Sequence, residues 1–166
     1  LRRALSGFKG VGRRFDVKAT VGGVTLIDDY SHHPTEIRAL LAAARGCGFK
    51  RLIVLFQPHR FTRTQHSWNE FLHCFDDADV LLLSEIYPAS EEPIPGVTGQ
   101  ALAEAIAAGG KTKVEFHAEL SEGAEAALRH LQPGDALLTV GAGSIWKVAE
   151  ELAARLPSAL GVTNAH

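Results

Sequence analysis

Methionine is absent from this 166-residue sequence, and only two cysteines and two tryptophans occur. Cys47 and Cys74 lie far apart and form no CxxC pattern, which argues against a disulfide framework or a zinc knuckle. Because the chain begins with Leu1 and contains no methionine, we expect it to be a piece of a longer protein. Its opening residues do not have the pattern of a secretory signal, so we expect a cytoplasmic location.

Neither sign of charge is in large excess, with 17 Lys and Arg against 19 Asp and Glu and a formal net charge of -2. Without a basic surplus, the sequence gives no support for nucleic-acid binding as the main function. No apolar run reaches the roughly 20 residues that a membrane-spanning helix needs. The sequence also has no GxxxxGK[ST] phosphate loop, no GxSxG elbow and no HExxH motif. We therefore expect an incomplete catalytic set and neither a nucleic-acid nor a membrane partner.

Apolar residues make up 46% of the chain, which suits one globular domain over residues 1–166 with a single core. Strands are predicted at 14–19, 24–29, 52–56, 80–83, 114–116 and 136–140, and helices at 34–45, 64–75, 98–108, 121–131 and 144–156. Strands that alternate with helices predict an α/β fold, a Rossmann-like open, mostly parallel six-stranded sheet with helices on both faces. The first two strands, joined by Gly22-Gly23, predict an antiparallel N-terminal hairpin at the sheet edge. Residues 157–166 are predicted to be a frayed tail.

Ligands of such folds bind beyond the carboxyl ends of the strands. That rule selects five segments for inspection: Asp28 to His33, Gln57 to Arg63, Ser84 to Pro88, His117, and Gly141 to Ser144. The loop around Ser84 is interpreted mainly as a proline-stiffened surface segment. The Gly141-Ala142-Gly143 turn could cradle a phosphate, but it could equally serve tight packing.

The richest of these segments is Asp28-Asp29-Tyr30-Ser31-His32-His33. A carboxylate here could bind ribose hydroxyl groups, or the Asp and His side chains could bind a metal. The spacing of the residues does not choose between these two sites.

The segment Gln57-Pro58-His59-Arg60-Phe61-Thr62-Arg63-Thr64 follows the most apolar strand. Arg60 and Arg63 are three residues apart and share one side if a helix begins early enough. Guanidinium groups at a helix N-terminus favour a carboxylate or phosphate ligand, because their planar forks bind such anions with two hydrogen bonds.

Several longer strings resemble the Mur ligase family over nearly the whole chain. They are Gly10 to Asp16, Asp-Asp-Tyr-Ser-His-His-Pro-Thr-Glu at 28–36, Phe-Gln-Pro-His-Arg-Phe-Thr-Arg-Thr at 56–64, and Ile-Tyr-Pro-Ala-Ser-Glu-Glu-Pro-Ile-Pro-Gly at 86–96. The string at 56–64 is most similar to the bacterial members that add L-alanine to UDP-N-acetylmuramate in peptidoglycan synthesis. The related recycling ligases that attach a tripeptide share the first string and remain an alternative.

The resemblance implies the C-terminal domain of a three-domain, ATP-dependent ligase that acts through an acyl phosphate. Residues 1–13 would be the interdomain linker, and the UDP-binding and central ATPase domains would be absent, which leaves this domain inactive alone. ATP and Mg²⁺ would bind mainly to the central domain, and no metal site is expected here. The ligands expected for the complete enzyme are L-alanine, ATP and UDP-N-acetylmuramate.

The resemblance also implies residue roles. Asp29 and Arg14 would contact ATP at its ribose and phosphates respectively, and Arg14 and His59 would be catalytic. The residues expected to receive L-alanine are Tyr30, His32, His59, Arg60 and Arg63. Two departures from the family pattern occur, because Ser31 replaces a usual Gly and Ser144 replaces a common Asp or Asn.

Two other classes of function are also considered. A non-enzymatic, receiver-like module would bind magnesium at Asp28 and Asp29, but the next strand ends in Phe56-Gln57 instead of Asp, and no Lys follows Val140. A metal hydrolase could use Asp29, His32, His33 and His59 as ligands, although these residues have no recognised spacing.

Overall fold

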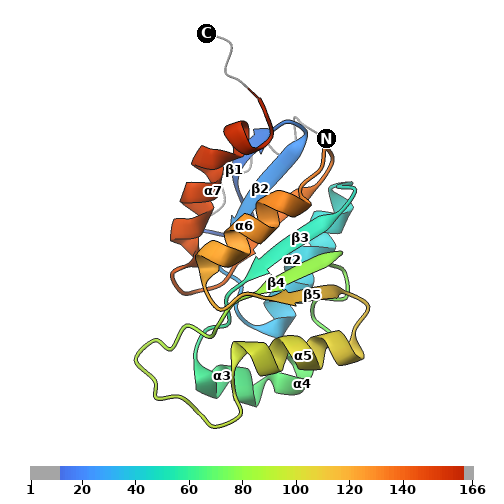
Figure 1. Cartoon of the computed structure of the whole chain (residues 1–166). Coiled ribbons are helices and arrows are strands. Elements are labelled where there is room, and N and C mark those ends of the chain that lie inside the picture. The colour runs from blue at the N-terminus through green and yellow to red at the C-terminus, as the bar shows by residue number, and fades with distance from the viewer. Residues whose placement is uncertain (1–11, 163–166) are drawn as a thin grey trace.

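Residues 12–162 are described by the computed structural model, in which six strands form one sheet in the order β1-β2-β6-β3-β4-β5 (Figure 1). The strands are β1 (Asp16–Val21), β2 (Val24–Asp29), β3 (Leu52–Phe56), β4 (Val80–Leu83), β5 (Lys113–Phe116) and β6 (Ala136–Val140). Only the β1–β2 pair is antiparallel, and the other four pairs are parallel. The predicted sheet with an antiparallel hairpin at its edge is therefore confirmed.

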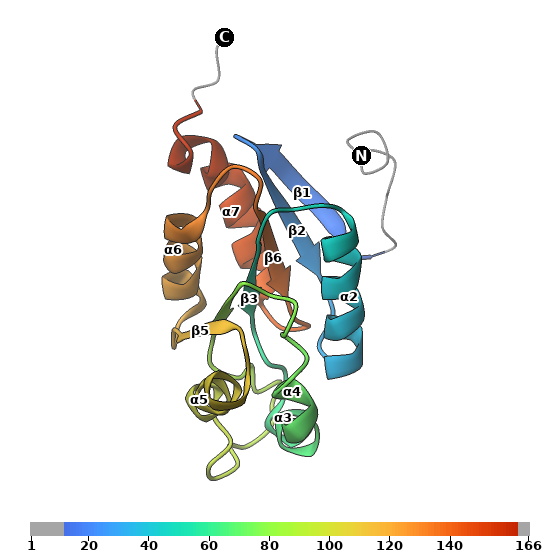
Figure 2. The same cartoon turned by 90° about the vertical axis from the view of Figure 1, so that its right-hand side faces the viewer.

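Helices cover both faces of this sheet (Figure 2). They are α2 (Pro34–Gly46), α3 (Phe61–His66), α4 (Trp68–Phe71), α5 (Gly99–Gly109), α6 (Leu120–His130) and α7 (Ile145–Ala159). Residues of α2, α4 and α5 pack in one apolar cluster, and residues of α6 and α7 pack in a second one on the opposite face. The predicted two-sided arrangement is confirmed.

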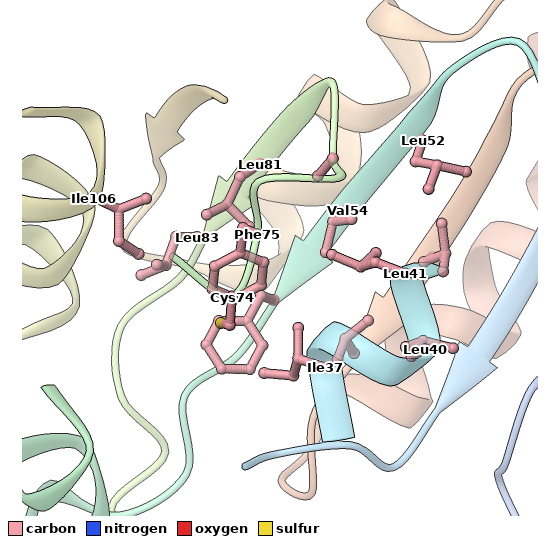
Figure 3. Packing of buried hydrophobic residues seen from close by; sticks show 14 of the residues in the cluster. Ile37, Leu40, Leu41, Leu52, Val54, Cys74, Phe75, Leu81, Leu83 and Ile106 are labelled. Atoms are coloured by element: carbon pink, nitrogen blue, oxygen red, sulfur yellow. The ribbon is translucent and has the colours of Figure 1, made fainter. Parts of the chain in front are cut away.

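Strand β3 shows why both faces must be covered. Its five residues are all buried, and alternate side chains enter opposite clusters. Leu52 and Val54 lie with Leu41 of α2, as Figure 3 shows, whereas Ile53 joins the cluster of α6 and α7. A continuous apolar run is typical of a parallel strand that is buried on both faces.

The helix predicted over 64–75 is wrong in both its start and its continuity. Helix α3 begins at Phe61, directly after Arg60, whose φ of 73° makes the sharp turn out of the strand region. The Oγ1 and N–H of Thr64 both donate to the Arg60 carbonyl and stabilise this early start. Ser67, with φ of -99° and ψ of 17°, then separates α3 from α4. Arg63 consequently lies inside a helix.

The predicted tail over 157–166 is wrong in its first residues, because α7 continues through Pro157 to Ala159. Proline removes one backbone donor there. The helix is nevertheless held by Leu156, which is fully buried, and by the N–H of Leu160, which donates to the Leu156 carbonyl. Residues 163–166, and residues 1–11 of the predicted linker, lie outside the described part of the chain.

Strand β6 is last in the chain but lies between β2 and β3. Because β2, β6, β3, β4 and β5 are mutually parallel, their carboxyl ends meet at one edge of the sheet. The segments selected from the sequence therefore converge at this edge, which we call the carboxyl edge.

Shortening Leu138 to Ala, in the middle of β6, should destabilise the fold strongly. Leu138 is fully buried and pairs with Ile27 and Val54, so the variant leaves a cavity and should lose about 2–5 kcal/mol of unfolding free energy in urea titrations. Leu160→Ala, at the partly buried end of α7, is the matched control and should lose less. Equal losses in the two variants would contradict the placement of β6 at the sheet centre.

Candidate functional site at the carboxyl edge

Backbone hydrogen bonds join the loops of the carboxyl edge to one another. The N–H of Gly141 donates to the Asp29 carbonyl, and the N–H of Gln57 donates to the Val140 carbonyl. Beyond the regular strands, His59 and Tyr87 form an isolated parallel bridge. The loops after β2, β6, β3 and β4 are thus adjacent, as the sequence analysis expected for this edge.

Asp28 is fully buried, and its charge is neutralised inside the protein. Arg13 Nε donates to Asp28 Oδ2 at 2.7 Å and Arg13 Nη2 to Oδ1 at 3.2 Å, while Thr139 Oγ1 donates to Oδ1 at 2.8 Å. Arg13 Nη2 also donates to the Gly141 carbonyl. Because these partners occupy it, Asp28 anchors the chain before β1 to β2 and β6.

Asp29 is also buried, with 3% of its surface exposed. Its Oδ2 accepts from the N–H of Phe15 at 2.6 Å, and its Oδ1 accepts from both the N–H and the hydroxyl of Ser31. An ionised carboxylate oxygen has two lone pairs. Oδ2 therefore has room for one further donor, and Oδ1 is saturated.

Arg14 crosses from the start of the chain to α2. Its Nη1 donates to Ser31 Oγ at 3.2 Å, its Nη2 donates to Glu36 Oε1 at 3.0 Å, and Nη1 lies 3.8 Å from Asp29 Oδ1. The side chain remains 45% exposed, so it can still meet an anion. Ser31, at the position where the family pattern has Gly, thus links Arg14 to Asp29 by its hydroxyl.

Tyr30 is one of the few large apolar side chains that are exposed, at 39%. The guanidinium carbons of Arg13 and Arg14 lie 5.5 and 5.9 Å from its ring centre, and the His32 ring meets it edge-on at 5.2 Å. These contacts hold the phenol ring in place.

Glu36 completes the N-terminal cap of α2. Burial raises the pKa of Glu36, but the hydrogen bonds from the His32 N–H, the Arg14 guanidinium and the His33 N–H together outweigh it and lower the pKa to about 2. His33 is the N-cap residue, and its ring accepts from the Thr35 N–H. Glu36 therefore stays charged and holds Arg14 and His32 at the carboxyl edge.

His59 and Arg63 form a directly bonded pair. Arg63 Nη1 lies 3.2 Å from His59 Nδ1. Arginine is always the donor, so Nδ1 must accept and Nε2 carries the ring proton. Burial, the charges of Arg63 and Arg60, and the nearby His32 all lower the pKa of His59, which keeps this neutral tautomer. The His32 ring lies 6.2 Å from the His59 ring, and Arg60 is exposed beside them.

Gln57 and the glycine turn serve α7. The N–H of Ile145 donates to Gln57 Oε1 at 3.1 Å, and Gln57 Nε2 donates to Ser144 Oγ at 3.2 Å. A Cβ on Gly143 would lie only 2.6 Å from Gln57 Oε1. The turn is therefore packed tightly against the β3 loop.

Three residues at this edge were not identified from the sequence as parts of the site. The sequence analysis places Arg13 in the linker, includes Glu36 only within a resembling string, and interprets the loop that contains Tyr87 as a surface segment. The Tyr87 ring stacks on His59, with ring centres 5.6 Å apart and an interplanar angle of 14°. The available signals were weak: Tyr87 lies within the selected segment Ser84 to Pro88, Glu36 follows the segment that ends at His33, and Arg13 lies within the resembling string Gly10 to Asp16.

The metal-based interpretations gain no support from the geometry. Among residues 12–162, no group of three or more His, Cys, Asp or Glu side chains is arranged to hold a metal ion. Asp28, which a receiver-like module would need for magnesium, is bound to Arg13. Within the same residues, no helix is both long and apolar enough to cross a membrane.

Comparison with known proteins decides the family. The family model described as "Mur ligase, glutamate ligase domain" matches residues 13–143. The chain belongs to this family. Its sequence is 50% identical over 160 residues to UDP-N-acetylmuramate–L-alanine ligase of Geobacter sulfurreducens, and 52% identical over 149 residues to the ligase of the same name from Oleidesulfovibrio alaskensis. These alignments cover 96% and 89% of this chain, but only 35% and 33% of the relatives.

Solved structures agree with this assignment. The UDP-N-acetylmuramate–alanine ligase of Thermotoga maritima matches with a TM-score of 0.66 and 26% identity, over 94% of this chain and 32% of that one. A murein peptide ligase of Psychrobacter arcticus matches with a TM-score of 0.67 and 22% identity, over 99% and 33%, and shows the shared fold alone. The relatives named for L-alanine are much more similar in sequence, so the tripeptide-adding alternative is not favoured.

Asp28→Asn should destabilise the domain by about 3 kcal/mol, because it removes the fully buried charge that pairs with the partly exposed Arg13 guanidinium. Chemical denaturation measures this loss. Asp16→Asn is the matched control, since Asp16 pairs with Lys18 at a more exposed position, and it should change the unfolding free energy by less than about 1 kcal/mol. A loss for Asp28→Asn no larger than the control's would contradict its anchoring role.

Glu36 should titrate with a midpoint of about 2 in carbon-detected NMR. A carboxyl whose pKa is lowered by folding stabilises the fold above its unfolded pKa, and this stabilisation is lost as the pH falls through the folded pKa. The stability difference between the protein and Glu36→Gln should therefore shrink between about pH 4.5 and pH 2. Arg14→Gln should raise the midpoint, and an unchanged midpoint would contradict the Arg14 contact.

Proposed function

We propose that this chain is the C-terminal domain of a bacterial ligase that adds L-alanine to UDP-N-acetylmuramate at the expense of ATP. The observation that carries the proposal is the group of His59, Arg60 and Arg63, two guanidinium groups and a neutral imidazole at one sheet edge. It is supported by the relatives of about 50% identity that bear this name. The chain spans about a third of their length, so the complete activity needs the rest of such a protein.

The amino-acid site lies on the side of the edge that β3 contributes. The carboxylate of L-alanine would bind Arg60 and Arg63, because guanidinium groups make strong, directional hydrogen bonds to carboxylates. His59 would help in two ways, by holding Arg63 through Nδ1 and by offering its Nε2–H to the ligand. Tyr30 and His32 would form the adjoining wall. Because its Nδ1 lone pair already accepts from Arg63, His59 would bind and position the ligand and would not take up a proton at that nitrogen.

The nucleotide site lies on the side that β2 contributes. A ribose hydroxyl of ATP would donate to the free lone pair of Asp29 Oδ2, and the exposed guanidinium of Arg14 would meet the phosphates. The phosphate loop and the Mg²⁺ ligands are assigned to the central domain, because this sequence has no GxxxxGK[ST] motif.

In the complete ligase, the lactyl carboxylate would be phosphorylated by ATP, the amine of L-alanine would attack the acyl phosphate, and phosphate would leave. This domain would contribute by positioning, since it holds the amino acid and neutralises charge near the phosphates. Closure of the domain onto its two partner domains would bring the amine to the acyl phosphate. The isolated domain would be inactive, and the enzyme would be cytoplasmic.

Arg63→Ala, made in the full-length ligase, should raise the KM for L-alanine by about 10- to 150-fold, because this is the usual effect of losing a hydrogen bond to a charged group. The KM for ATP should stay within about two-fold. ADP release at varied L-alanine measures both values. Arg129→Ala is the matched control. Arg129 lies near the end of α6, at the edge of the sheet opposite the carboxyl edge, so this variant should behave as the parent. An unchanged KM for L-alanine in Arg63→Ala would rule out the proposed carboxylate site.

The same assay separates the two ligase types. The parent enzyme should release ADP with L-alanine and not with the tripeptide L-alanyl-γ-D-glutamyl-diaminopimelate. Faster turnover of the tripeptide would assign the chain to the recycling ligases.

A further inference from the structure

The loop after β4 is tied to the loop after β3 by the backbone of Tyr87. The N–H of Tyr87 donates to the Pro58 carbonyl, and the Tyr87 carbonyl accepts from the N–H of Arg60, both at 2.8 Å. These bonds make Tyr87 the bridge partner of His59. Bridge partners present their side chains on the same face, which explains why the two rings stack.

Gly143 limits the space in which the Tyr87 ring can lie. A Cβ at position 143 would come within 2.7 Å of Tyr87 Cγ and 2.9 Å of Tyr87 Cβ. Such distances do not occur without a displacement, so the absence of a side chain at 143 is what admits the tyrosine. The tyrosine is therefore confined by contacts from two loops, with His59 and with Gly143.

The Tyr87 ring stacks on an imidazole whose orientation matters for Arg63. His59 can accept from Arg63 Nη1 only if the imidazole keeps its present orientation and its Nδ1 lone pair. The titratable and charged groups around it are Arg60 and Arg63 from its own segment, His32 from the β2 loop, and Glu91 from the β4 loop. Tyr87 contributes a flat ring that stacks on the imidazole.

We propose that Tyr87, seated against Gly143, is a positioning residue that holds the His59 ring in the orientation that bonds Arg63. The importance of this contact for L-alanine rests on the function proposed above, whereas the contact itself can be tested without it. The glycine turn after β6 would then support the proposed L-alanine site indirectly, because it leaves space for the Tyr87 ring.

The test is nitrogen-15 NMR of the histidine rings in the full 166-residue chain, followed as a function of pH. In the parent protein, His59 should be the Nε2–H tautomer with a pKa below the ordinary value. Tyr87→Phe keeps the flat ring and should leave both properties unchanged. Tyr87→Leu removes it, so the His59 pKa should rise toward 6.5 as water reaches the ring, and both tautomers should be populated.

Gly143→Ala provides a second route to the same result, because its Cβ would displace the Tyr87 ring, together with Gln57 Oε1, without replacing the tyrosine. This variant should also raise the His59 pKa. Trp146→Ala, which removes another exposed aromatic ring of this edge, is the control and should leave His59 as in the parent. If Tyr87→Leu is folded and its His59 tautomer and pKa match the parent's, the proposal is wrong. If Tyr87→Leu does not fold, Gly143→Ala decides in the same way.

Kinetics of the full-length ligase distinguish this proposal from the proposed function. Tyr87→Leu should raise the KM for L-alanine about three- to ten-fold, the usual effect of losing an aromatic pair, with kcat and the KM for ATP nearly unchanged. If the NMR changes occur but neither Tyr87→Leu nor Arg63→Ala alters that KM, the positioning role stands and the L-alanine site is wrong. If Arg63→Ala raises the KM for L-alanine but the His59 signals of Tyr87→Leu match those of the parent, the L-alanine site stands and the positioning role of Tyr87 is wrong.

Discussion

The carboxyl edge depends on a buried charge that has to be neutralised. Asp28 has no access to water, and a buried carboxylate is costly unless it is paired. Arg13 supplies the opposite charge, and Thr139 supplies a further donor. Because Arg13 precedes β1 and Thr139 lies in β6, the Asp28 carboxylate fixes the segment before β1 relative to the centre of the sheet. With Arg13 held there, Arg14 bonds Glu36 and the N–H of Phe15 bonds Asp29.

In the proposed function, the strand order divides two tasks along this edge. Strand β2 ends in the acidic pair of Asp28 and Asp29, against which the half-exposed Arg14 lies, and the segment after β3 carries the pair of His59 and Arg63. Strand β6, between them, adds a turn whose glycines allow close packing. The His32 ring, from the loop after β2, lies 6.2 Å from the His59 ring, from the loop after β3. In the proposed function, these adjacent loops would place the nucleotide and the amino acid side by side. A ligase that joins an activated acid to an amine needs such adjacency.

The strands and the edge could be predicted because they depend on local patterns. Apolar runs such as Leu52 to Phe56 are typical of buried parallel strands, and the strand-end rule then selects the ligand-bearing loops. The failures have tertiary causes. Helix α3 starts early because Arg60 adopts a positive φ, and α7 passes Pro157 because its apolar side is buried. The contact of Arg13 with Asp28 and that of Tyr87 with His59 could not be predicted, because each pair is distant in the sequence and is brought together only by the order of the strands.

We propose that the carboxyl edge receives the amino acid on the side of β3 and the nucleotide on the side of β2. A crystal structure of the full-length ligase with L-alanine and a non-hydrolysable ATP analogue tests it most directly. The alanine carboxylate should lie on the guanidinium groups of Arg60 and Arg63, and the nucleotide ribose within hydrogen-bond distance of Asp29 Oδ2. Alanine bound away from these arginines, or a ribose bound without contact to Asp29, would contradict it.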